Sequence, residues 1–260
     1  MFVDFIEYDS FMDPESNLDV PFVPTDEKLV EAMLEMGGVG PDDVLYDLGC
    51  GDGRIVVAAA KDRGARAVGV DVDPLRIQES REYAEWTGVD HLVEFVEEDL
   101  FCADFSRATV VTMYLLHSVN LELRPHLLQG LRPGTRVISH AFDMGDWKPD
   151  ERLAAGGATL YKWIIPAQVE GTWEWTDTEG RQFRLELKQA YQEISGKAWI
   201  NGAEAELETA KLRGARLEFA IRDKNEESAD VFRMLYVDQQ LQPMKDSKQA
   251  GPAVMVLPKS

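Results

Sequence analysis

Residues Val44–Gly53 read Val-Leu-Tyr-Asp-Leu-Gly-Cys-Gly-Asp-Gly, and this stretch decides the fold. Its apolar first half is typical of a short buried strand. Glycines at alternate positions then end the strand and allow a tight turn whose backbone can approach a ligand closely. A helical pattern follows from Arg54 to Lys61, with Ile55, Val56, Ala58 and Ala59 facing inward. The segment therefore predicts a strand, a glycine loop and a helix in direct succession.

The surrounding chain alternates between helical and strand patterns from about residue 27 to residue 142. Asp73 and Pro74 are a good N-cap and first helical residue, and Thr25 is a candidate cap for the first helix. Strands separated by helices predict a parallel sheet with helices on its faces. We expect helices at 27–36, 54–61, 74–86 and 120–129, and strands at 44–48, 66–71, 92–96, 109–116, 135–142 and 159–165.

The pattern changes after Pro149, where short alternating strands follow one another without helices. Turn residues such as Asn201-Gly202 and Arg213-Gly214 separate them. This predicts a small all-β meander, either a barrel or a sandwich, over residues 166–260, with a loose tail at 245–251. Residues 1–165 would form the α/β domain. The expected strands are 169–175, 183–189, 193–200, 203–208, 215–222 and 231–237.

Composition limits the possible partners. The 260 residues carry a net charge of −20, which would repel a nucleic-acid duplex and suits a small molecule or a basic protein. No apolar run approaches the roughly 20 residues that span a bilayer, and the acidic N-terminus lacks the basic start of a secretory signal. The two cysteines, Cys50 and Cys102, make no disulfide framework, and no metal-ligand spacing occurs. We expect a cytoplasmic protein without a metal, a membrane span or a nucleic-acid partner.

The glycine loop distinguishes between two classes of cofactor. Dinucleotide folds favour G-x-G-x-x-G, which aims a helix N-terminus at a pyrophosphate. Here the spacing is G-x-G-x-G, and Asp47 precedes the first glycine by two residues. An acid in this position would repel a pyrophosphate, whereas it suits the cationic sulfonium and amino groups of S-adenosylmethionine (AdoMet). The loop therefore favours AdoMet.

Further acids follow the next two strands. Asp71 can take both ribose hydroxyls, and Glu98-Asp99 can reach the adenine amino group beside an apolar wall from Leu100 and Phe101. Acids at three successive strand ends would converge on one sheet edge, although turn glycines in a ligand-free α/β domain remain the alternative. The predicted cofactor-binding residues are Val23, Thr25, Asp47, Gly49, Cys50, Gly51, Gly53, Asp71, Val72, Glu98, Asp99 and Leu100.

These motifs resemble the Rossmann-like class I AdoMet-dependent methyltransferases over roughly residues 20–165. The stretches Pro21–Thr25, Gly51–Lys61 and Phe142–Asp150 are similar to bacterial relatives of the mitochondrial lysine methyltransferases that modify the ATP synthase c-subunit and the adenine nucleotide translocator. The resemblance implies a protein lysine as methyl acceptor. Those mitochondrial enzymes lack the C-terminal β domain, so its role is open: substrate recruitment, a homodimer, or a cover for the sheet edge.

The acceptor side should lie after the fourth and fifth strands. Methyl transfer needs proximity, desolvation and a neutral nucleophile, which an aromatic-lined channel favours. Tyr114 can line such a channel, and Phe142, Asp143 and Trp147 can close it, although each can equally be a packing or loop residue. His117 fits a helix start better than a base. A small-molecule methyltransferase and a non-catalytic AdoMet-binding module remain the alternative functions.

Overall fold

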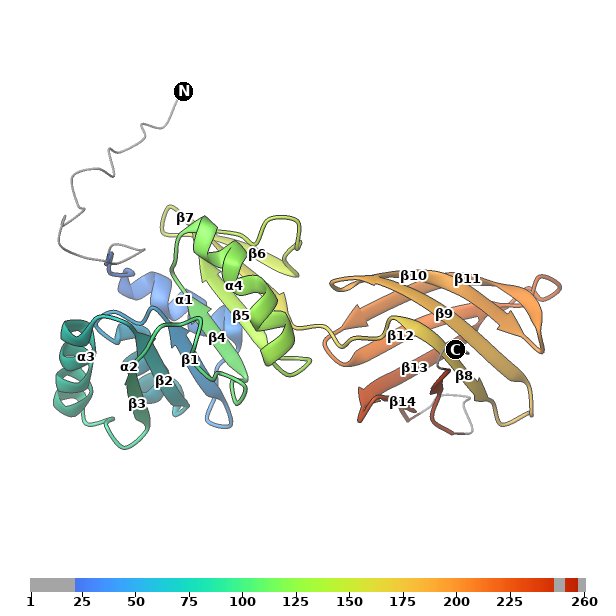
Figure 1. The fold of residues 1–260 in the computed structure, drawn as a ribbon, viewed down its shortest axis with the longest axis horizontal. Coiled ribbons are helices and arrows are strands. Elements are labelled where there is room, and N and C mark those ends of the chain that lie inside the picture. The colour runs from blue at the N-terminus through green and yellow to red at the C-terminus, as the bar shows by residue number, and fades with distance from the viewer. Residues whose placement is uncertain (1–21, 246–250, 257–260) are drawn as a thin grey trace, which may run out of the picture. The chain divides into compact units, whose positions relative to one another are not determined.

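The computed structural model describes residues 22–245 and 251–256. It divides into two compact units (Figure 1): one holds the described residues up to Leu131 together with Arg136–Trp163, and the other holds Arg132–Thr135 and the described residues from Ile164 onward. Most of the expected C-terminal tail falls at 246–250, outside the described residues.

The first unit is built on a seven-stranded mixed sheet with the order β3-β2-β1-β4-β5-β7-β6. Strands β3, β2, β1, β4 and β5 are paired in parallel, as the sequence predicted. The last two strands form an antiparallel hairpin, and its exposed edge strand β6 was not predicted. The strands are β1 Val44–Leu48, β2 Arg66–Asp71, β3 Val93–Glu97, β4 Val110–Met113, β5 Arg136–His140, β6 Glu151–Ala155 and β7 Ala158–Ile164.

Four helices accompany this sheet: α1 Glu27–Gly37, α2 Arg54–Arg63, α3 Pro74–Thr87 and α4 His117–Gly130. Asp73 caps α3 as predicted, since its side chain accepts from Leu75 N at 2.9 Å. The prediction of Thr25 as the cap of α1 was wrong, because Asp26 caps that helix. Helix α4 also begins earlier than predicted, so β4 is correspondingly short.

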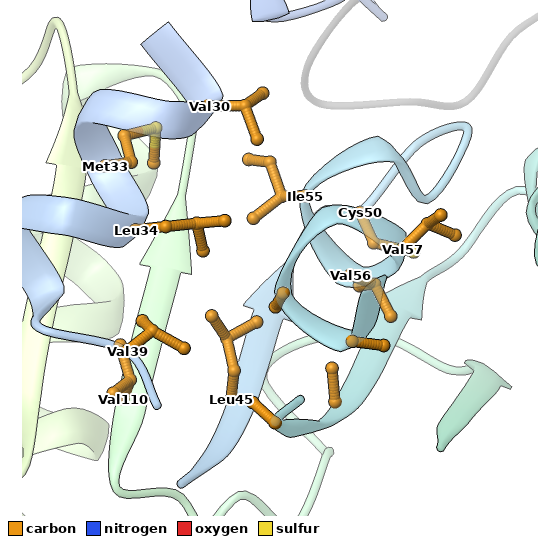
Figure 2. Close-up of a cluster of buried hydrophobic side chains, with 14 of the residues drawn as sticks. Val30, Met33, Leu34, Val39, Leu45, Cys50, Ile55, Val56, Val57 and Val110 are labelled. Atoms are coloured by element: carbon orange, nitrogen blue, oxygen red, sulfur yellow. The ribbon is translucent and has the colours of Figure 1, made fainter. Parts of the chain in front are cut away.

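The core of the first unit lies where α1 and α2 pack on the sheet. Figure 2 shows Ile55 of α2 facing Val30 and Leu34 of α1, with Leu45 of β1 beneath them. These side chains are buried, and Leu34 and Leu45 are fully excluded from solvent. Burial of this apolar surface fixes α2 on the sheet, and with it the glycine loop that precedes α2.

The second unit is one antiparallel sheet of eight strands in the order β14-β13-β12-β11-β10-β9-β8-β15. An isolated β-bridge between Leu241 of β14 and Ala253, just before β15, brings the two outer strands together, so the sheet is barrel-like and nearly closed. Inside it the Trp175 and Phe183 rings stack, and the Phe232 ring packs edge-to-face against both. The strands are β8 Gly171–Thr176, β9 Gln182–Ala190, β10 Glu193–Ile200, β11 Ala203–Arg213, β12 Arg216–Arg222, β13 Asp230–Val237, β14 Gln240–Pro243 and β15 Val254–Val256.

Candidate active site

The glycine loop after β1 follows a path that side chains could not take. Gly49, Gly51 and Gly53 have φ values of 76°, 53° and 77°, in the left-handed region that favours glycine. A Cβ at Gly49 would lie 2.7 Å from Leu115 Cδ2, and one at Gly51 would lie 2.3 Å from Phe22 Cε2. The loop therefore packs so closely against its neighbours that a side chain at these positions would clash.

Asp47 lies at the carboxyl end of β1 and is 2 % exposed. Its Oδ1 accepts a hydrogen bond of 2.7 Å from Thr112 Oγ1 on β4. Burial raises the pKa of Asp47 to about 7, against the opposing effect of the Thr112 hydrogen bond and with smaller contributions from Asp71 and Asp52. A cation in the neighbouring cavity would stabilise the ionised carboxylate.

Acids at the ends of β2 and β3 are oriented by backbone amides. Asp71 accepts from Gly51 N at 2.7 Å and from Asp73 N at 3.0 Å. Asp99 accepts from Phe101 N at 2.9 Å, and Glu98 N donates to Asp71 O at 3.0 Å. The carboxylates are thus held beside the glycine loop at the edge where the parallel strands end, the place where ligands bind in such sheets.

A cavity of about 230 Å³ lies over this edge. Most of the predicted cofactor-binding residues line it, whereas Gly51 and Gly53 shape the loop without lining the cavity. The predicted residues that line it are Val23, Thr25, Asp47, Gly49, Cys50, Asp71, Val72, Glu98, Asp99 and Leu100. Burial raises the pKa of the Cys50 thiol, so Cys50 is a small neutral residue of the wall.

The sequence did not predict the contacts that hold the segment ahead of α1, at Phe22 and Thr25, beside the cavity. Arg54 donates through Nη1 to Thr25 O at 2.7 Å and forms an ion pair with Asp52 at 2.5 Å. The Arg76 guanidinium lies 4.0 Å from the centre of the Phe22 ring, in cation–π geometry. The available signal in the sequence was the closeness of an acid, Asp52, and a base, Arg54, at the end of the glycine loop. Pro24 and Phe101, which the sequence had also pointed to, line the cavity, and the lining residues that were not predicted are Phe22, Asp52, Arg54, Ile55, Val70, Asp73, Arg76, Leu115 and Val119.

Among the predicted acceptor residues, Tyr114 lines the cavity, whereas Phe142, Asp143 and Trp147 do not. Asp143 lies 3.5 Å from His117 at the start of α4. Trp147 is fully buried, and its carbonyl accepts from Trp163 Nε1 at 2.8 Å. Interior packing against β7 thus places Trp147 in the core, away from the cavity surface.

Beside Tyr114 lies the ring of His140, a residue to which the sequence analysis gave no role. Its ring centre lies 3.8 Å from that of Tyr114, with 32° between the planes. His140 is buried, and desolvation lowers the pKa of its imidazole, which favours the neutral form. Within the described part of the chain, no group of His, Cys, Asp and Glu side chains is placed to hold a metal ion.

The residues present fit AdoMet. Buried Asp47 offers a counter-charge for a cation, Asp71 offers paired acceptors for a ribose, and Leu100 with Phe101 offers an apolar wall for a base. Together with the seven-stranded sheet, this site defines the class: the chain is an AdoMet-dependent methyltransferase with a Rossmann-like catalytic domain.

Comparison with known proteins gives the family. Residues 47–151 match the ANTKMT methyltransferase domain. A protein-lysine N-methyltransferase of Saccharolobus islandicus is 50% identical over 151 residues, covering 56% of this chain and 94% of that protein. The chain belongs to this methyltransferase family.

Two further proteins are similar to this chain. The ATP synthase C-subunit lysine N-methyltransferase of Xenopus laevis is 33% identical over 150 residues, covering 58% of this chain and 66% of that protein. A solved structure from Salinibacter ruber, described as an RNA methyltransferase in complex with S-adenosyl-L-homocysteine, is 54% identical with a TM-score of 0.56. It covers 56% of this chain and 96% of that one. No helix among the described residues has the length and apolar character needed to cross a membrane.

Proposed function

We propose that this enzyme transfers a methyl group from AdoMet to the side-chain amine of a protein lysine. The observation that carries the proposal is the contrast along one sheet edge. Acids lie at the carboxyl ends of β1, β2 and β3, and the neutral ring pair of Tyr114 and His140 lies at the ends of β4 and β5. The first half suits a cationic cofactor, and the second suits an amine that must be neutral to react. The names of the Saccharolobus and Xenopus relatives support the same acceptor.

Bound AdoMet supplies a methyl group on a cationic sulfur, which a neutral amine can take up by in-line displacement. Asp47 and Asp71 bind and orient the cofactor. The segment at Val23 and Thr25, held by Arg54, covers it and excludes water. The Tyr114 ring lines the path of the incoming amine and disfavours its protonated form by desolvation. Roles for Phe142 and Asp143 in closing this path, and for Trp147 in supporting it from the core, belong to the same proposal.

A labelled-methyl transfer assay tests the acceptor. The full-length enzyme is incubated with methyl-labelled AdoMet and a lysate of cells that lack its gene, and the labelled material is separated into protein, RNA and small molecules. We expect label in a protein band, with methyl-lysine found by mass spectrometry of its peptides. The Asp71→Ala variant is the matched negative control. Label confined to the small-molecule fraction would refute the protein acceptor.

RNA is the second candidate acceptor, because the Salinibacter ruber relative is described as an RNA methyltransferase. The net charge of −20 weighs against it, since phosphate contacts require basic surface. Ribonuclease treatment before the assay distinguishes the two acceptors: it removes the label from an RNA product and leaves a methylated protein unchanged.

The proposal also covers the location of the enzyme, the roles of its domains and its oligomeric state. A cytoplasmic location, a division of labour between domains at 1–165 and 166–260, and a homodimer through the β domain are predictions of the sequence. Size-exclusion chromatography with light scattering tests the last of these: a homodimer has twice the mass of 29.2 kDa.

A further inference from the structure

We propose that His140 is a positioning residue for methyl transfer, whose neutral ring holds Tyr114 at the acceptor end of the cofactor cavity. The inference rests on the proposed function and adds to it a residue that acts through Tyr114. It starts from the register of the sheet. Strands β4 and β5 are parallel, with Met113 opposite Ser139, so Tyr114 and His140 follow as neighbours at the carboxyl edge.

The His140 ring packs closely against one face of the Tyr114 ring. Their centres lie 3.8 Å apart and their planes differ by 32°. Tyr114 is half-buried and lines the cavity, while His140 is 5 % exposed and is absent from the cavity wall. His140 therefore supports one face of the tyrosine ring from inside the protein and leaves the other side available to the cavity.

The surroundings of His140 keep its ring neutral. Within the described residues, its buried Nδ1 has no hydrogen-bond partner. A proton added there would create a buried donor, and a buried charge, without compensation. Neutrality matters at this place because an imidazolium would repel both a cationic sulfonium and an approaching ammonium. A neutral flat ring supports Tyr114 without adding charge.

The backbone around His140 is fixed by its own contacts. Ala141 has a φ of 68°, so the chain turns sharply directly after the ring, and Ala141 N donates to Thr159 O at 2.9 Å. Ser139 Oγ donates to Phe142 O at 2.7 Å, and Asn120 Nδ2 on α4 donates to Ser139 Oγ at 3.1 Å. The end of β5 is held on both sides, so His140 has a fixed base from which to hold Tyr114.

The test compares His140→Ala, which removes the ring, with His140→Phe, which keeps a flat neutral ring without nitrogen. Each full-length variant is assayed for methyl transfer at increasing lysate protein and for AdoMet binding by calorimetry. We expect His140→Ala to lower the maximal rate about 10- to 100-fold, because displacement of a positioned group has effects of this size. Its AdoMet Kd should stay within about twofold, and His140→Phe should restore most of the rate. His91→Ala, an exposed histidine outside the cavity, is the control.

A double-mutant cycle with Tyr114→Leu keeps the inference testable if His140→Ala also lowers stability. Because His140 acts through Tyr114, the double variant should transfer methyl groups no more slowly than Tyr114→Leu alone. Independent, multiplicative losses would overturn the inference, as would an unchanged rate in His140→Ala. If the wild type labels no protein lysine, the proposed function fails instead, so the two failures are distinguishable.

Discussion

The sheet edge at which the parallel strands end has two halves of different chemistry. We call the ends of β1, β2 and β3 the cofactor half, and the ends of β4 and β5 the acceptor half. Carboxylates lie at the ends of β1, β2 and β3, and two of them accept hydrogen bonds from backbone amides. Two closely packed, tilted rings lie at the ends of β4 and β5, and the more deeply buried of them is a histidine with a lowered pKa. A charged cofactor and a neutral nucleophile need opposite electrostatics. By our proposal, the carboxylates of one half bind the cofactor, whereas the absence of charge in the other half prepares the acceptor amine.

The largest effect should follow from removing a carboxylate of the cofactor half. Asp71→Ala removes the group that accepts from Gly51 N and, by our proposal, from the ribose. Hydrogen bonds to a charged group contribute about 1.5–3 kcal/mol, so we expect the Kd for AdoMet to rise about 10- to 100-fold in isothermal titration. Asp90→Ala, an exposed acid between α3 and β3, is the matched control. Equal binding by Asp71→Ala and wild type would show that the cofactor half does not work through these acids.

A smaller effect should follow from releasing the segment that covers the cavity. Arg54→Met keeps the apolar stem but loses the bonds to Thr25 O and Asp52. Because the Arg54 side chain is 31% exposed, solvent screens the pair, and we expect the Kd for AdoMet to rise only about 3- to 10-fold. The control is Arg63→Met on the same helix, whose partner Glu31 lies outside the cavity. An unchanged Kd in Arg54→Met would mean that the covering segment contributes nothing to cofactor binding.

The two halves also differ in how far the sequence could predict them. The cofactor half depends on local rules: a strand that ends in spaced glycines, and acids that directly follow strands. Those rules predicted β1, β2 and the cap at Asp73, and most of the predicted cofactor residues line the cavity. The acceptor half depends on which strands become neighbours. Tyr114 and His140 meet through the β4–β5 register, and buried Trp147 is bonded to Trp163 of β7.

The misses in the fold come mainly from weak local signals. Strand β6 is exposed along nearly its whole length, so it carries no alternating apolar pattern. Thr25 was a reasonable cap, but the adjacent Asp26 accepts from Lys28 N instead. Strands β14 and β15 are short, so their patterns are brief as well. The bridge between Leu241 and Ala253, which brings the two outer strands of the second unit together, is a tertiary contact that no local pattern predicts.

The last prediction concerns the stability of the ligand-free protein, which the buried carboxylate of Asp47 lowers. Burial raises the pKa of its carboxyl from an ordinary value of 3.8 to about 7 in the folded state. Between these values the folded protein holds a proton that the unfolded chain has lost. The contribution of Asp47 to stability therefore falls as pH rises from about 4 to about 7 and is least favourable above that range. Asp47→Asn removes the charge but keeps an oxygen that can accept from Thr112.

Melting of the ligand-free protein at two pH values checks this expectation. At about pH 8 the Asp47→Asn variant should melt roughly 10 °C above wild type, since a rise of about three pKa units corresponds to about 4 kcal/mol and each kcal/mol to about 2–4 °C at this size, and near pH 4 the difference should vanish. Added AdoMet should raise the melting temperature of the wild type more than that of the variant, because only the carboxylate gains a counter-charge. If the variant melts at or below the wild type at the higher pH, the buried charge is already compensated within the protein. The contrast between a charged and a neutral half would then have to rest on Asp71 and Asp99 alone.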